Sequence, residues 1–139
     1  MNGPTTDRGD RTAEQSWVLV GRAAGGGWLA RKRRRIGGTA ASVETDWRWA
    51  LARDERSGDV VGFLHTHPHG FVTAPSARDV RTMQAWCTAL GRPLVCLIAD
   101  GRQLDAYVFA DDESPGVRAR AWRVKLGKFF VAAPDSEAT

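Results

Sequence analysis

The stretch VVGFLHTHP, residues 60–68, decides the fold that the sequence predicts. Its first five residues are apolar apart from one glycine, which is typical of a buried strand. In an extended chain, residues two apart point to the same side, so His65 and His67 can direct both imidazoles at one point. Pro68 then ends the strand. The segment therefore predicts a core strand that brings two histidines to one end of a sheet.

A helix is predicted to begin shortly after the histidines. Ser76 is a favoured N-cap residue, and Asp79 three positions later resembles the acidic partner of a capping box. Gly91 and Pro93 end the helix. Its apolar face consists of residues spaced by three or four, namely Val80, Met83, Cys87 and Leu90.

Two imidazoles and a carboxylate are a recurrent ligand set for catalytic zinc, with water in the fourth position. Asp79 is the natural third ligand beside His65 and His67, because a single loop can fold the start of the helix back over the histidines. Asp79 taken alone is explained more simply as a capping carboxylate. His69 follows Pro68 into the loop and is interpreted as facing solvent.

Taken together, GFLHTHP (62–68) and PSARD (75–79) resemble the JAB/MPN family of zinc metalloproteases, whose JAMM motif joins an upstream glutamate to HxHP and S-x-x-D. The resemblance covers roughly residues 13–109. It implies an α/β (α+β) fold with a mixed, largely antiparallel sheet flanked by helices, similar to the cytidine-deaminase-like fold. It also implies that His65, His67 and Asp79 hold one catalytic Zn²⁺ ion and that Ser76 is the catalytic serine.

The same resemblance implies a general base upstream of the histidines. The segment AEQSWVLVG (13–21) fits the family pattern E-x-x-G-x-L-x-G in register, with Trp17 in place of the inner glycine. Glu14 is therefore the predicted base, with Glu44 and Glu55 as alternatives. The helix that normally precedes this glutamate is missing or shortened, which predicts an open face for a partner or a second copy of the chain.

The resemblance implies hydrolysis of the amide or isopeptide bond after the C-terminal glycine of a ubiquitin-like protein. The leaving group is either a conjugated target, which predicts E1-like and E2-like partners encoded nearby, or a precursor extension. An enzyme that processes a sulfur-carrier protein of thiamine or molybdopterin synthesis is the first alternative. A non-enzymatic scaffold of the MPN type and a basic nucleic-acid-binding protein are the disfavoured alternatives. The short chain suggests a minimal bacterial-type member.

The rest of the chain predicts further strands and leaves two segments open. Residues 17–20 and 28–36 form a long hairpin, and residues 94–98 and 104–109 form a second one. Residues 45–56 fit either a strand or a helix. The segment after Asp111 is also open, because Ser114-Pro115 is typical of a helix start whereas residues 122–130 alternate as in a strand.

The 139 residues suit one domain, predicted over residues 13–132 with tails at 1–12 and 133–139. No apolar run approaches the roughly 20 residues that a membrane-spanning helix needs, and the first residues do not resemble a secretory signal. Cys87 and Cys96 lie in apolar segments and form no CxxC pair, so they are interpreted as reduced core residues. These features predict a cytoplasmic protein with no membrane partner.

The formal net charge is +4, and the run Arg31-Lys32-Arg33-Arg34-Arg35 supplies most of the excess. One interpretation is a substrate-binding site that docks an acidic surface of a ubiquitin-like protein. The other is a solvated strand edge that keeps the protein soluble. Both interpretations place the basic side chains on the exposed side of the predicted strand.

Overall fold

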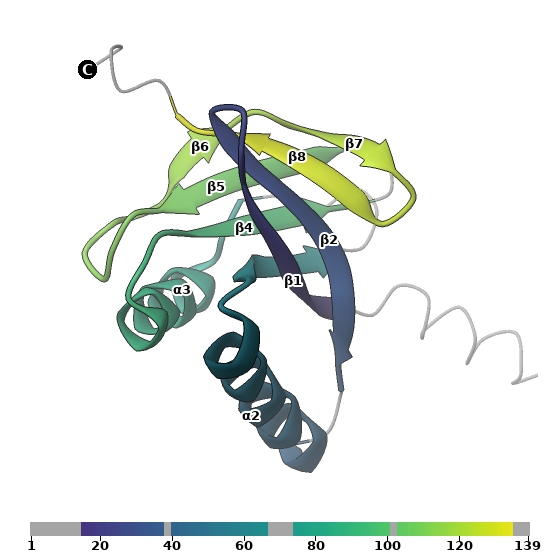
Figure 1. Ribbon diagram of the computed structural model, residues 1–139. Helices are drawn as coiled ribbons and strands as arrows, with labels where there is room; N and C mark the ends of the chain where they lie inside the picture. The colour runs from purple at the N-terminus through teal and green to yellow at the C-terminus, as the bar shows by residue number, and fades with distance from the viewer. Residues whose placement is uncertain (1–14, 38–39, 67–73, 101–102, 135–139) are drawn as a thin grey trace, which may run out of the picture.

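The computed structural model describes residues 15–37, 40–66, 74–100 and 103–134, with the backbone alone for residues 40–45. In chain order the elements are β1 (Gln15–Ala24), β2 (Gly27–Ile36), α2 (Ala40–Ser57), β3 (Val60–Thr66), α3 (Ala77–Leu90), β4 (Leu94–Ala99), β5 (Leu104–Phe109), β6 (Val117–Ala119), β7 (Ala121–Lys125) and β8 (Lys128–Ala132). All the strands of the described residues belong to one sheet, in the order β6-β5-β4-β3-β1-β2-β8-β7 (Figure 1).

Strand β3 lies inside this sheet and carries His65 near its end. It pairs with β1 in antiparallel orientation and with β4 in parallel orientation, whereas the other strand pairs are antiparallel. The parallel pair follows from the crossover through α3, because parallel neighbours need a long connection. Val60, Phe63 and Leu64 are almost completely buried. The predicted core strand and the mixed, largely antiparallel sheet are both confirmed.

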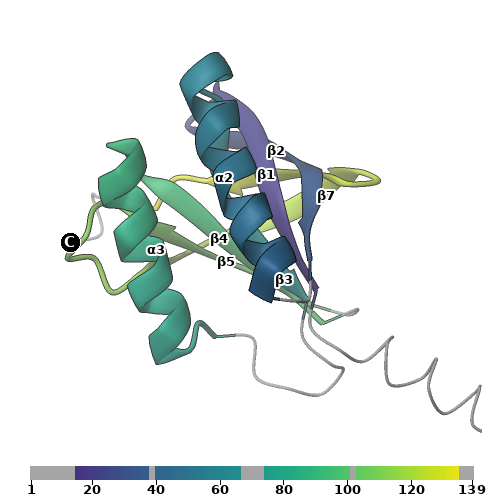
Figure 2. The same ribbon diagram turned by 90° about the horizontal axis from the view of Figure 1, so that it is seen from below.

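Helices α2 and α3 cover the same face of the sheet (Figures 1 and 2). Trp47 of α2, Phe63 of β3 and Trp86 of α3 pack their rings against one another, with centroids 5.1–5.5 Å apart. The segment that the sequence left open is thus a helix, because Ala50 is completely buried one turn after Trp47 whereas Leu51 is 45% exposed. The three rings join both helices to the strand that carries His65.

The opposite face of the sheet has its own core, because the sheet curls and brings β7 into contact with β5. Leu19, Leu64, Leu97 and Phe129 are among the residues buried there. Tight contacts between neighbouring strands require glycine at Gly62, where a Cβ atom would lie 1.9 Å from the carbonyl oxygen of Val95.

The segment after Asp111 forms β6, β7 and β8 rather than a helix. Ser114 turns the chain with its hydroxyl accepting a hydrogen bond from the backbone N–H of Gly116. Gly116 has a φ of 90° and packs under the ring of Phe109, a backbone conformation that interrupts a helix. The alternation of residues 122–130 therefore outweighs the helix-start signal of Ser114-Pro115.

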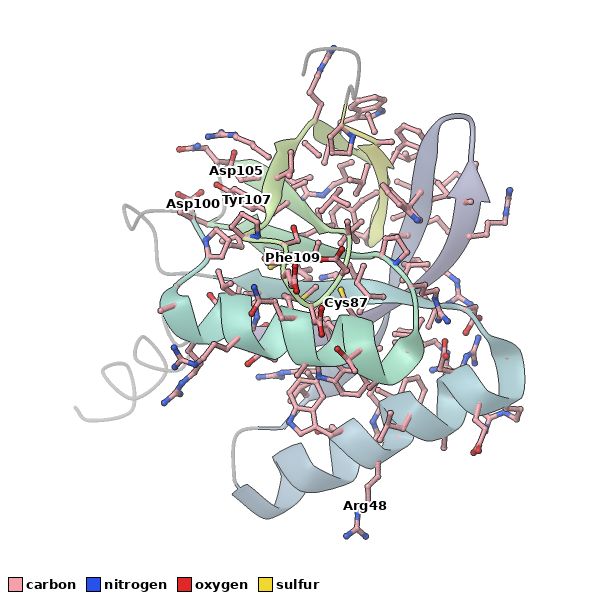
Figure 3. All side chains as sticks on the ribbon, turned by 90° about the vertical axis from the view of Figure 1, so that its left-hand side faces the viewer. Arg48, Cys87, Asp100, Asp105, Tyr107 and Phe109 are labelled. Carbon is pink, nitrogen blue, oxygen red and sulfur yellow. The ribbon has the colours of Figure 1, made fainter. Side chains whose placement is uncertain are left out.

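Cys87 and Cys96 are free and buried, as the sequence predicts. The thiol of Cys87 on α3 donates a hydrogen bond to the backbone oxygen of Phe109 on β5, 3.3 Å away (Figure 3). Burial raises the pKa of Cys96 to about 12, so this thiol stays protonated at neutral pH. In the described part of the chain, no helix is both long and apolar enough to cross a membrane.

Candidate metal centre

His65 lies where β3 leaves the core, and its imidazole has contacts on both ring nitrogens. Its Nδ1 is 2.9 Å from the hydroxyl oxygen of Ser16, which is the register partner of His65 on β1. Its Nε2 is 3.7 Å from Oδ1 of Asp79. The next register pair, Gln15 and Thr66, is tied by a 2.9 Å hydrogen bond from the Gln15 N–H to the Thr66 hydroxyl. The β1–β3 register therefore places the Ser16 hydroxyl against Nδ1, and this contact orients the His65 ring.

Asp79 reaches His65 because a capping box holds the start of α3. The backbone N–H of Ser76 donates to Oδ2 of Asp79 at 3.0 Å, and the backbone N–H of Asp79 donates to the Ser76 hydroxyl at 3.1 Å. The predicted N-cap and capping box are both confirmed. Because Oδ2 accepts the capping hydrogen bond, it is Oδ1 that faces the imidazole.

The His65–Asp79 pair fits a zinc ion. Two ligands of one tetrahedral zinc lie roughly 3.4 Å apart, given zinc–ligand distances of about 2.1 Å, and the observed Nε2–Oδ1 distance is 3.7 Å. An imidazole that binds metal through Nε2 carries its proton on Nδ1 and donates it to an outer group. The Ser16 hydroxyl is placed to accept that hydrogen bond. Among the described residues no cluster of three His, Cys, Asp or Glu side chains forms.

Two predicted members of the site lie outside the described residues, namely His67 and Glu14. In the sequence, His67 directly follows Thr66, the last residue of β3, and Glu14 directly precedes Gln15, the first residue of β1. The side chain of Glu44, one alternative base, is also outside the described part, whereas Glu55 is exposed on α2. The roles assigned to these residues remain predictions.

A cleft of about 270 Å³ opens beside the His65–Asp79 pair, between the helices and the ends of β1, β2 and β3. Its polar end holds Ser16, His65, Arg78 and Asp79, and its apolar wall includes Phe63, Trp47 and Met83. Ser76 is exposed and does not line the cleft. The arrangement suits an extended chain whose reacting bond lies at the polar end while apolar side chains contact the wall.

The end of β2 forms one rim of this cleft through Arg35, Ile36 and Gly37. Asp46 of α2 is buried and accepts hydrogen bonds from Arg34 Nε at 2.9 Å and from the backbone N–H of Gly37. Since β8 pairs with β2 only as far as Arg31, the segment from Arg33 to Ile36 has no strand partner on that side among the described residues.

The basic run does not present all its side chains on one exposed side, contrary to the expectation. Lys32 lies 4.6 Å from the ring centroid of Trp17 on one face, whereas Arg34 pairs with Asp46 on the other. Arg33 and Arg34 also lie over the ring of Trp49. In a regular strand Lys32 and Arg34, two residues apart, would share a face. A β-bulge at Arg33, where Val18 pairs with Arg34 and Leu19 pairs with Lys32, turns them to opposite faces, and α2 supplies partners that the sequence pattern does not reveal. Arg31 and Arg35 are the exposed residues at the two ends of the run, on different parts of the surface.

Ser16 is the residue of the site that sequence reasoning missed. It touches His65 across 49 positions of sequence, and only the β1–β3 register brings the two together. The one available signal was its place two residues after Glu14, in the strand expected to begin there.

A mixed, mostly antiparallel sheet with two helices is consistent with the fold of a JAB domain. The family described as prokaryotic homologs of the JAB domain matches residues 7–125. The chain therefore belongs to the family of prokaryotic JAB-domain homologs. The wider JAB-domain family includes hydrolases. A comparison with curated proteins finds no match.

Proposed function

We propose that this chain is a zinc-dependent peptidase that cleaves the amide or isopeptide bond after the C-terminal glycine of a ubiquitin-like protein. The observation that carries the proposal is the His65–Asp79 pair, which strand pairing and a capping box hold 3.7 Å apart beside a cleft. His67 is the proposed third ligand. When bound, a zinc ion supplies a Lewis acid for the scissile carbonyl and activates water at neutral pH.

The remaining chemistry belongs to side chains of this chain. Glu14 takes the proton from the attacking water and delivers it to the leaving amine, which is general acid–base catalysis. Ser76 lies outside the cleft, next to Asp79 at the start of α3, so its role as donor requires the scissile carbonyl oxygen to project toward that helix end. Its hydroxyl can donate there while its oxygen accepts the Asp79 N–H, because a hydroxyl both donates and accepts. Such a donor contributes roughly 3 kcal/mol to transition-state stabilisation where it is fully engaged.

The cleft also supports an extended substrate tail. A tail that runs along the open part of β2, from Arg33 to Ile36, gains backbone hydrogen bonds and leads into the cleft. Its last residues then lie between the apolar wall and the His65–Asp79 pair.

The direct test is cleavage of a linear fusion in which ubiquitin, or a ubiquitin-like protein encoded beside this chain, precedes a reporter. We expect cleavage after the final glycine, its loss with a strong chelator and its return with added Zn²⁺. Retention of the full rate after chelation would refute the metal mechanism. Cleavage of linear fusions without cleavage of lysine-linked conjugates would assign precursor processing rather than deconjugation.

Ser16→Ala is expected to weaken zinc binding ten- to hundredfold, the usual effect of removing the group that orients a ligating histidine. The reason is that Nδ1 of His65 loses its 2.9 Å partner and the ring is free to turn. Competition with a chromogenic chelator measures the zinc dissociation constant without any substrate. Ser57→Ala, at the exposed end of α2, is the control. Wild-type affinity in Ser16→Ala would show that strand pairing alone orients the ring.

A further inference from the structure

The outer side of strands β2, β8 and β7 carries two neighbouring rows of side chains. Register partners on adjacent strands point to the same face of a sheet. Leu29, Phe130 and Trp122 are successive partners and form an apolar row. Arg31, Lys128 and Lys125 are successive partners in the same way and form a cationic row beside it. We call these two rows the outer patch.

Each row costs stability in the isolated chain. All three cations are exposed. Lys128 stands between Arg31 on one neighbouring strand and Lys125 on the other, and this arrangement is destabilising because like charges repel. Among the described residues none of the three has an ion-pair partner. From residue 114 to residue 134 the sequence contains five Arg or Lys residues and no Asp or Glu. Asp59 lines the same groove as Arg31 and Lys128 and acts electrostatically on Arg31, but its carboxylate is already paired with Arg53, so the row keeps an excess of positive charge.

The apolar row is only partly covered, because Leu29 and Phe130 are half-buried and Trp122 is exposed. Trp122 is 48% exposed, and at the adjoining β7–β8 turn Val124 is 49% and Leu126 95% exposed. A cluster of exposed apolar side chains on a small protein is typical of an interaction site. The patch continues into a groove lined by Leu29, Arg31 and Lys128 at the far end of β1 and β2. Measured along β1 from Ser16, its cationic row, opposite Val20, is about 13 Å away and its apolar row, opposite Arg22, is about 20 Å away, so the patch is separate from the candidate metal centre.

We infer that the outer patch docks an acidic protein segment that carries exposed apolar side chains. Such a partner would pair its carboxylates with the cationic row and bury the apolar row, which relieves both costs together. A second copy of this chain is disfavoured, because the same surface would set cations against cations. The inference is independent of the proposed peptidase activity.

A single-stranded nucleic acid fits the patch less well than a protein does. Stacking of bases requires aromatic faces that are open to the base. The rings of Trp122 and Phe130 instead pack against each other, tilted by 42° with centroids 5.2 Å apart, and the Phe130 ring covers Gly27. The aliphatic side chains of Leu29, Val124 and Leu126 offer nothing for stacking.

The test measures binding of short fluorescein-labelled probes by anisotropy. The probes are a peptide in which Glu alternates with Leu and Val, a matched peptide in which Glu alternates with Ser, and an oligothymidylate. We expect the Glu–Leu/Val peptide to bind more tightly than either of the others. In the ¹⁵N-labelled protein, it should shift amide signals of β2, β7 and β8 rather than those around His65.

Two variants remove the two rows separately. We expect two variants, Lys125→Glu/Lys128→Glu and Trp122→Ser, each to lower the affinity for the Glu–Leu/Val peptide by roughly tenfold or more. Arg56→Glu/Arg81→Glu, with the same change of charge on exposed helix positions, should alter binding by less than about twofold. Absence of saturable binding, an equal effect of the control variant, or tighter binding of the oligothymidylate would overturn the inference.

Discussion

Asp79→Asn should lose zinc binding by at least about a hundredfold and cleavage by about a thousandfold. The substitution removes the negative charge that faces Nε2 of His65 at 3.7 Å. A catalytic metal contributes several kcal/mol to its reaction, and each 1.36 kcal/mol corresponds to about a factor of ten in rate. The amide oxygen of asparagine can still accept the hydrogen bond from the Ser76 N–H, so α3 should begin at the same residue.

Calorimetric titration with Zn²⁺ measures the first effect, and thermal unfolding of the metal-free protein checks the fold. Asp112→Asn is the matched control, because Asp112 is an exposed carboxylate on the loop after β5. It should change neither zinc binding nor cleavage. Stoichiometric zinc binding with unchanged affinity in Asp79→Asn would remove Asp79 from the proposed ligand set, whatever the function of the protein.

Gly62→Ala should be among the most destabilising substitutions in the domain, with a loss of about 3 kcal/mol or more in the free energy of unfolding. The added Cβ would lie 1.9 Å from the backbone oxygen of Val95 and 2.7 Å from its Cγ2 atom. Neither strand can move aside easily, because β3 is paired on both sides and Val95 is completely buried. Urea denaturation of the metal-free protein measures the change.

Gly25→Asn is the control for replacing a glycine. Gly25 has a φ of 51° in the β1–β2 turn, with open space around it, and asparagine tolerates this left-handed conformation. Its free energy of unfolding should change by less than about 1 kcal/mol. A Gly62→Ala protein as stable as the wild type would mean that β3 and β4 approach each other less closely than the structure shows.

The sequence predicted the elements whose signals are local. The apolar run at 60–64, the capping box of Ser76 and Asp79, and the β4–β5 hairpin each depend on residues a few positions apart, and each is confirmed. Residues 45–56 were ambiguous because their tryptophans fit both periodicities. The helix is favoured by the packing of Trp47 against Phe63 of β3 and Trp86 of α3. These partners lie on other elements, so the local sequence does not reveal them.

The candidate site was predictable only in part for the same reason. Asp79 and His65 could be paired through a recognisable spacing, but the contact between Ser16 and His65 depends on the register of two strands distant in sequence. Likewise, Lys32 contacts Trp17 and Arg34 pairs with Asp46. The pattern of charges in the sequence does not reveal either partner.

The position of β3 between β1 and β4 also determines when the domain can mature during synthesis. His65 on β3 contacts Ser16 on β1, a strand that is synthesised much earlier. The other neighbour of β3 is β4, which is synthesised only after α3. The pairing of β3 with β1 and with β4 joins residues that are far apart in the sequence. Such contacts form late in folding, because closing long loops is slow. A nascent chain that ends before β4 contains every residue of the HTHP-to-Asp79 motif, yet its β3 lacks one neighbour. The proposed hydrolytic activity is therefore expected to appear only when most of the domain has left the ribosome.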